Sequence, residues 1–95
     1  MIKIVAKQVI RKDCIGKYRE LTKELVEKSQ AEAGNIMYTS NQSTADERVH
    51  CFIEIWKDQE AIDIHNATEH FTRIVPQFGA MFDGPEVVDL YTESV

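Results

Sequence analysis

Apolar and polar residues alternate along the first ten positions of the chain. One side of this alternation is mostly apolar and carries Ile2, Ile4, Ala6, Gln8 and Ile10. The other side carries two lysines and two valines. A period of two with many β-branched residues is typical of a β-strand. The pattern therefore predicts a strand over residues 2–10.

The period changes to three or four residues after Asp13. The residues that recur at this spacing are Ile15, Tyr18, Leu21, Leu25 and Ser29. Charged residues cover the opposite side, as on an amphipathic helix. Gly34 is expected to end this helix in a left-handed conformation, which glycine adopts easily. The helix would be about 30 Å long, enough to cover one face of a small sheet.

Two further strands are predicted over residues 36–42 and 48–56, and the short polar link STADE between them indicates a hairpin. The side chains of the second strand form two rows. The apolar row is expected to face the core and consists of Val49, Cys51, Ile53 and Ile55. The other row is mixed, which is unusual for a face in contact with bulk water, and consists of His50, Phe52, Glu54 and Trp56.

The rest of the chain predicts two helical segments and a closing strand. Asp58 is expected to cap a short helix, and Asn66 or Thr68 is expected to start the next. Pro76 should bend or break that second helix unless it falls in a first turn. Residues 87–93 alternate again after a turn signal and predict the last strand.

The predicted order of elements is β-α-β-β-α-β, the split βαβ arrangement. It predicts an α+β, ferredoxin-like fold in a single domain over residues 1–95, with a four-stranded antiparallel sheet and helices on one face. The other face has no helix to cover it, although Phe52 and Trp56 are expected there. A second copy packed sheet to sheet is the simplest cover, so we expect an obligate homodimer.

Charge and cysteine content narrow the partners and the compartment. The chain has 16 acidic and 11 basic residues, a net charge of −5, and no cluster of lysines and arginines. Nucleic acid is therefore not expected as a partner, because phosphate binding needs concentrated positive charge. Lysines interrupt the apolar run at the N-terminus, which argues against a signal peptide or a membrane span. Cys14 and Cys51 lie far apart, as expected for reduced thiols in a cytoplasmic protein.

Residue spacing argues against a bound metal or nucleotide cofactor. His65 and His70 are five positions apart, so on one continuous helix they would lie about 140° apart around the axis. The spacing that places two histidines on one helix face for zinc is four residues. No glycine-rich phosphate loop occurs, so neither NAD nor a flavin is expected.

The stretch EIWKDQEAIDIHNATEHF, residues 54–71, is the best candidate for chemistry. Histidine titrates near neutrality, so His65 or His70 could take a proton from a weakly acidic substrate. Glu54 lies inside the most regular strand, where a carboxylate must be paired, hydrated or functional. A purely structural interpretation stays open, with Glu54 in solvent, Trp56 packing and both histidines at a helix junction.

This stretch resembles the signature of the antibiotic biosynthesis monooxygenase family, E-x-W followed by A-x-x-x-H-x-x-T-x-H. The matching residues are Glu54, Trp56, Ala61, His65, Thr68 and His70. Upstream, AEAGNIMY is similar to the family's turn into its second strand. The resemblance implies a dimeric α+β barrel whose best-known members oxygenate quinols or polycyclic phenols without metal, flavin or haem. In those enzymes the deprotonated substrate reacts directly with dioxygen.

Carried over by position, the resemblance also implies catalytic roles. His65 would be the pocket histidine and the first candidate base. Glu54 would be an orienting or polarising residue. His70 would be a second polar contact or would stabilise its helix.

The walls of the site and its partners follow from the same resemblance. Trp56 and Tyr38 would line or bound the cavity. Asn35 would hydrogen-bond the substrate oxygen or complete the turn before the second strand. The expected partners are a small aromatic substrate, O₂ and a second copy of the chain, with no cofactor and no membrane.

Two other branches of the family have characteristic residues that can be compared with this sequence. The haem-degrading branch has an asparagine on the first strand, where this chain has Ala6. It also has a tryptophan in place of His65 and a histidine ten residues later, where this chain has Val75. Haem degradation is therefore not expected. Isomerases of a phosphorylated signal molecule share the pattern of His65 and His70, so this chemistry stays open.

An isomerase of that kind would need a basic group such as Lys28, Arg48 or Arg73 near the phosphate. A non-catalytic dimeric module that binds a small molecule is the third alternative, because a fold does not fix a function.

Overall fold

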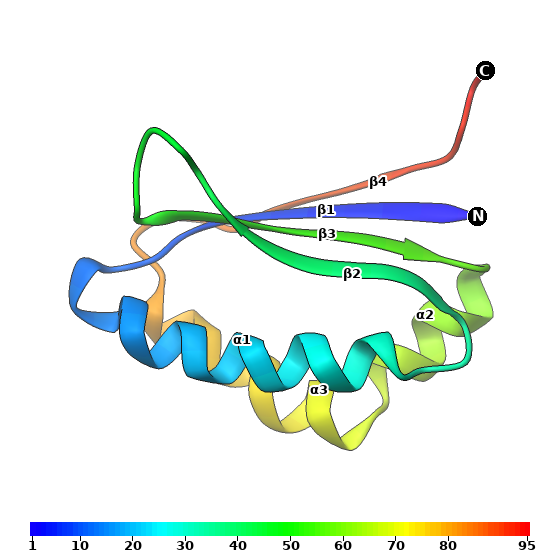
Figure 1. The fold of residues 1–95 in the computed structure, drawn as a ribbon, viewed down its shortest axis with the longest axis horizontal. Helices are drawn as coiled ribbons and strands as arrows, with labels where there is room; N and C mark the ends of the chain where they lie inside the picture. The colour runs from blue at the N-terminus through cyan, green and yellow to red at the C-terminus, as the bar shows by residue number, and fades with distance from the viewer.

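The computed structural model describes all 95 residues as a four-stranded antiparallel sheet with helices on one side (Figure 1). The strands are β1 (Ile2–Val9), β2 (Asn35–Gln42), β3 (Val49–Trp56) and β4 (Val87–Tyr91), in the spatial order β2-β3-β1-β4. The helices are α1 (Ile15–Gln30), α2 (Gln59–Asn66) and α3 (Glu69–Ile74), with 3₁₀ segments η1 (Lys12–Cys14) and η2 (Val75–Met81). The predicted ferredoxin-like α+β fold is confirmed.

Local sequence signals place most element boundaries. Each strand begins and ends within two residues of its predicted position. Asp58 caps α2 by accepting a hydrogen bond from the Ala61 N–H at 2.9 Å. Pro76 falls in the first turn of η2, where the missing N–H of proline removes no helical hydrogen bond. None of the helices is long and apolar enough to cross a membrane.

Gly34 does not end α1 as predicted. The helix ends at Gln30, so its 16 residues span about 24 Å. The glycine with a left-handed φ, 128°, is Gly84 in the turn before β4. Gly34 instead lies against α2, where an added Cβ would stand 2.4 Å from the Cβ of Ala61. The prediction was wrong because close packing between distant segments, not a helix stop, requires glycine here.

The two rows of β3 are reversed relative to the prediction. The mixed row, expected on the uncovered face, lies under the helices, and each of its members is at most 7% exposed: His50, Phe52, Glu54 and Trp56. The apolar row expected to be core is only half-buried.

Aromatic packing explains why the helices cover the mixed row. The ring of Phe52 lies 6.4 Å from that of Tyr18 on α1 and 6.1 Å from that of Phe78 on η2. Large rings fill the space between a sheet and its helices and pack well in tilted pairs. The polar members also find partners, since Glu54 accepts a hydrogen bond from Trp56 Nε1 at 2.9 Å. Apolar content alone therefore did not decide which row became core.

The opposite face of the sheet has no helix over it (Figure 1). The half-buried row of β3 lies on this face, and Val5 of β1 sits between Ile53 of β3 and Asp89 of β4. The apolar centre of the face consists of Val5, Val9, Val49, Ile53 and Ile55. These uncovered apolar residues are the observation on which the expected homodimer depends.

Candidate active site

The chain breaks between α2 and α3, and the break brings two histidines together. Thr68 starts α3 by accepting a hydrogen bond from the Phe71 N–H at 3.2 Å. Its hydroxyl also donates to the His65 carbonyl at 2.7 Å, which ties the two helices to each other. The helix start expected at Asn66 or Thr68 is confirmed at Thr68. The separation of about 140° that applies to one continuous helix therefore does not keep His65 and His70 apart.

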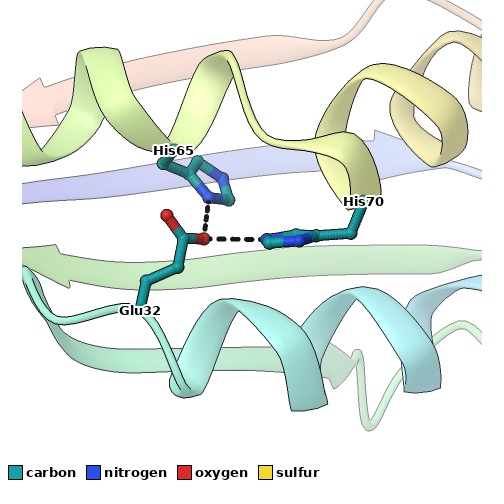
Figure 2. Close-up of side chains that lie close together, drawn as sticks. All are labelled: Glu32, His65 and His70. Carbon is teal, nitrogen blue, oxygen red and sulfur yellow. Dashed lines mark hydrogen bonds and ion pairs between the residues drawn. The ribbon is translucent and has the colours of Figure 1, made fainter.

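Glu32 joins the two imidazoles (Figure 2). Its Oε2 lies 2.6 Å from His65 Nδ1 and 2.9 Å from His70 Nε2. Glu32 belongs to the turn that follows α1, so three segments that are distant in sequence converge on one oxygen atom. The other oxygen, Oε1, is buried and has no hydrogen-bond partner.

Sequence reasoning assigned no role to Glu32. It is the acidic residue of AEAGNIMY, the stretch that resembles the family's turn into the second strand. Within that stretch it looks like an ordinary polar residue after a helix. Its contacts with His65 and His70 form only when α2 and α3 are folded against it.

The Glu32 carboxylate fixes the proton on His65. Because Glu32 accepts at Nδ1, the neutral imidazole carries its proton there and its lone pair on Nε2. Burial lowers the pKa of His65, and the hydrogen bond to Glu32 opposes that effect. The residue is 2% exposed, and the hydrogen bond that its ring makes within the chain goes through Nδ1, not Nε2. His65 is therefore a neutral base at neutral pH, with a free lone pair on Nε2.

A cavity of about 320 Å³ lies beside His65, between the sheet and the helices. This volume falls within the range of small-molecule sites. The wall is mostly apolar and includes Ile4, Ala6, Phe52, Ile62, Phe71 and Val75. His65 lines the cavity and His70 does not, so His65 is the histidine that a bound molecule can reach.

Glu54 also lines the cavity, from the inward row of β3. It is 7% exposed, and its Oε1 accepts the hydrogen bond from Trp56. Burial raises the pKa of Glu54 to about 7, and the bond from Trp56 offsets part of this rise. A carboxyl group with this pKa can give or take a proton near neutral pH.

Tyr38 and Trp56 hold different positions at the site. Tyr38 lines the cavity, and burial raises the pKa of its hydroxyl well above the ordinary value, so it stays protonated. Trp56 is fully buried beside His65, with the two ring centroids 4.4 Å apart, and is not part of the cavity wall. Its position restricts the imidazole, whereas Tyr38 can contact a ligand.

Asn35 lies outside the cavity wall. Its amide donates to the Met37 carbonyl at 3.1 Å and to the Ile55 carbonyl at 3.5 Å, where the pairing of β2 is irregular. Of the two predicted roles for Asn35, completing the turn is the one that these contacts provide.

Together, Glu32, His65 and His70 also form a donor set for a metal ion. The ligand atoms of Glu32, His65 and His70 lie within 4.8 Å of one another, and imidazole nitrogen and carboxylate oxygen are ligands of zinc and iron. An ion would take the lone pair of His65 Nδ1 and leave the proton on Nε2. The hydrogen-bonded arrangement has the opposite effect, because it keeps Nε2 free to accept a proton.

The sequence matches a known family and curated proteins. The sequence model of the antibiotic biosynthesis monooxygenase family matches residues 1–77. "Putative monooxygenase YcnE" of Bacillus subtilis is 34% identical over 61 residues, which is 64% of each chain. An uncharacterized protein of Synechocystis is 25% identical over 71 residues, 75% of this chain and 48% of that protein. The chain thus spans less than two thirds of the length of these curated relatives.

Solved structures share the fold over nearly the whole chain. A crystal structure of an antibiotic biosynthesis monooxygenase is 37% identical, with a TM-score of 0.95 and full coverage of both chains. A conserved protein from Methanosarcina mazei is 27% identical, with a TM-score of 0.94 over 98% of this chain and 92% of that one. The regions compared include the segments that carry Glu32, Glu54 and His65.

Proposed function

Because this chain belongs to the antibiotic biosynthesis monooxygenase family, we propose that it is a monooxygenase that oxidises an aromatic quinol or phenol with O₂ and needs no cofactor. One observation carries the proposal. His65 is neutral and buried, its Nδ1 is held by Glu32, and its ring lines a mostly apolar cavity, where Nε2 is left to accept a proton.

The proposed reaction begins when a substrate hydroxyl gives its proton to His65 Nε2. Glu32 stabilises the resulting imidazolium through Nδ1, as carboxylates do for catalytic histidines. The phenolate then supplies electrons to O₂. The substrate gains one oxygen atom and loses two hydrogens, which leave with the second oxygen atom as water. All electrons come from the substrate, so no separate reductant is required.

Glu54 is suited to a later proton transfer in this reaction. Water forms from the second oxygen atom only if that atom receives protons. A carboxyl group with a pKa of about 7 is partly protonated at neutral pH and lies in the wall of the same cavity. We assign Glu54 as the acid that donates to the departing oxygen.

The apolar wall supports the same chemistry. Excluding water strengthens the interaction between the phenolate and the imidazolium, because the surroundings have a low dielectric constant. It also limits side reactions of the anion with water. Phe52, Phe71 and Tyr38 provide flat surfaces against which an aromatic ring can pack.

We propose that the protein acts as a homodimer in the cytoplasm. The uncovered apolar face of the sheet would be buried against the same face of a second copy, as two-fold oligomers require. Both Cys14 and Cys51 are free thiols, which suits a reducing compartment.

The charge of the cavity wall argues against a phosphorylated substrate. The wall contains Glu54 and Glu86 but no lysine or arginine. Lys28, Arg48 and Arg73 instead pair with carboxylates outside the cavity. An isomerase of a phosphorylated signal molecule would therefore lack a basic group for the phosphate.

Oxygen uptake with menadiol tests the proposed function. His65→Ala removes the base and is expected to lower kcat/KM about 10²- to 10⁴-fold, the usual contribution of such a group. An oxygen electrode measures the rate, with the uncatalysed oxidation of menadiol subtracted. Circular dichroism and size-exclusion chromatography check that the variant is folded and has the oligomeric state of the wild type.

Glu32→Gln separates the base from the residue that positions it. It should lower kcat/KM less than His65→Ala and should move the acid limb of the pH profile to lower pH, because losing the negative charge lowers the pKa of His65. Glu20→Gln, at an exposed position of α1, is the matched control. Wild-type activity in folded His65→Ala would reject His65 as the base. No oxygen uptake, with ligand binding unchanged in His65→Ala, would favour a non-catalytic module.

A further inference from the structure

Gln8 is a buried polar residue in the cavity wall that the proposed reaction does not use. It is 3% exposed and follows Ile4 and Ala6 on the inward side of β1. A buried amide is costly unless its oxygen and nitrogen both find partners. Here Oε1 accepts a hydrogen bond from the Tyr18 hydroxyl, and Nε2 donates to Glu86 Oε2.

Tyr18 determines which end of the amide faces Glu86. Burial raises the pKa of the Tyr18 hydroxyl, so the hydroxyl stays protonated and donates to Gln8 Oε1. The amide nitrogen must then point toward Glu86. That nitrogen carries two N–H groups, and Glu86 takes only one of them. The second N–H is left for a ligand.

Glu86 lines the same cavity from the position just before β4. Unlike Gln8 it is exposed, so a ligand can reach it from the mouth of the cavity. The bond from Gln8 uses Oε2, and Oε1 can accept another hydrogen bond. A free donor and a free acceptor therefore lie side by side.

This pair lies at the opposite end of the cavity from Glu54. On β1, Ile4 pairs with Glu54, and Gln8 lies four residues further along, about 13 Å at the usual rise of a strand. The wall between the two ends is apolar and includes Ala6, Phe52 and Val88. The cavity thus has polar groups at both ends and an apolar middle.

We propose that Gln8 and Glu86 form a second binding subsite, the far subsite, for a hydroxyl group at the distal end of an elongated aromatic substrate. A hydroxyl can donate to Glu86 Oε1 while it accepts from Gln8 Nε2. Glu86 would repel a carboxylate or phosphate, and a C–H group would satisfy neither partner. The distance between the ends favours two or three fused rings over one. The inference rests on the proposed function only for the reaction at the His65 end.

Binding of two anthraquinones under anaerobic conditions tests the far subsite. The probe 2,6-dihydroxyanthraquinone has a hydroxyl at each end, whereas 2-hydroxyanthraquinone has one. Quenching of Trp56, the single tryptophan of the chain, measures both dissociation constants without turnover. The dihydroxy compound is expected to bind about 10- to 100-fold more tightly, as hydrogen bonds to a charged group imply.

Glu86→Ala should reduce this preference to about threefold, since only the neutral Gln8 donor remains. Glu20→Ala, which removes an exposed glutamate of α1, should keep the wild-type preference. Gln8→Leu tests the donor, with thermal unfolding as a check because Tyr18 loses its acceptor. Equal affinity of the wild type for the two compounds, or an undiminished preference in Glu86→Ala, would overturn the subsite.

Failure of the far subsite can be told apart from failure of the proposed function. A preference for the dihydroxy compound without any oxygen uptake would support the subsite in a protein that only binds its ligand. Oxygen uptake that depends on His65, with no such preference, would reject the subsite and keep the monooxygenase.

Discussion

The two faces of β3 present opposite combinations of polarity and burial. Toward the helices, the strand buries a histidine, a glutamate and two aromatic residues. Away from the helices, the more apolar row, Val49, Cys51, Ile53 and Ile55, is only half-buried. Within this one strand, the row with the polar residues is therefore the more buried one.

The difference has a separate cause on each face. The inward row borders a cavity, and there burial raises the pKa of Glu54 to about 7, where the group can exchange protons near neutral pH. The outward row lies on a sheet face that no helix covers, where apolar side chains suit contact with a second copy. Burial within the chain therefore follows the position of the helices, and the remaining apolar residues are those that the proposed dimer would bury.

Placing a charge on the outward row should have the largest effect. Ile53→Asp would bury an unpaired carboxylate twice in a two-fold interface, so we expect the dimer to weaken about 10³-fold or more. Sedimentation equilibrium over a range of protein concentrations measures the dissociation constant.

Ile64→Asp is the matched control for this substitution. Ile64 is an isoleucine of α2 that is 58% exposed on the helical side of the molecule. Its replacement should leave the association unchanged. A wild-type dissociation constant in Ile53→Asp would show that the outward row is not the interface, and an assembly model based on this face would be wrong.

Removing the charge of Glu54, on the inward row, should have a smaller, pH-dependent effect on stability. The pKa of Glu54 is about 7 in the folded chain against an ordinary value of 4.5. Below pH 4.5 both states are protonated and the group has no effect. Between these values only the unfolded chain ionises, so the native state loses stability as pH rises, and above pH 7 the loss is complete. Glu54→Gln should therefore stabilise the fold by about 3 kcal/mol at pH 8 and very little at pH 4.

Urea unfolding at pH 4, 6 and 8 measures this effect. The glutamine oxygen can still accept the hydrogen bond from Trp56, so the difference reports mainly on the charge. Glu60→Gln, at an exposed position of α2, should change stability little at any of these pH values. A Glu54→Gln effect that is independent of pH would mean that Glu54 is not desolvated as its position implies.

The fold could be predicted largely because its signals are local. The alternation of apolar and polar residues predicted the strands, and the capping side chains of Asp58 and Thr68 indicated where two helices begin. The faces of β3 could not be assigned in the same way, because both rows contain large apolar residues and either could have met the helices. Only the packing of Tyr18 and Phe78 on Phe52 decides between them.

The site was predictable only in part. His65 lines the cavity, as its place in the family signature implied, and Glu54, expected only to orient or polarise, lines it as well. His70 instead contacts Glu32, and Glu32 was missed because its contacts join residues more than 30 positions apart. A contact over that distance depends on how α1, α2 and α3 pack, which no single stretch of sequence encodes.

Gly34 provides the smallest and most local test of how α2 is held over the inward row. Gly34→Ala places a Cβ against Ala61 and should destabilise the fold by about 1–3 kcal/mol, the usual cost of overpacking. Ala61→Gly opens the same space, at the cost of about 1 kcal/mol for a glycine in a helix. The double variant should then be more stable than the sum of the two single effects by about 1 kcal/mol or more.

Urea unfolding of the four proteins completes the cycle. Strictly additive effects would mean that the two segments do not meet at these atoms, and the close approach that holds α2 above Glu54 and Trp56 would have to be sought elsewhere.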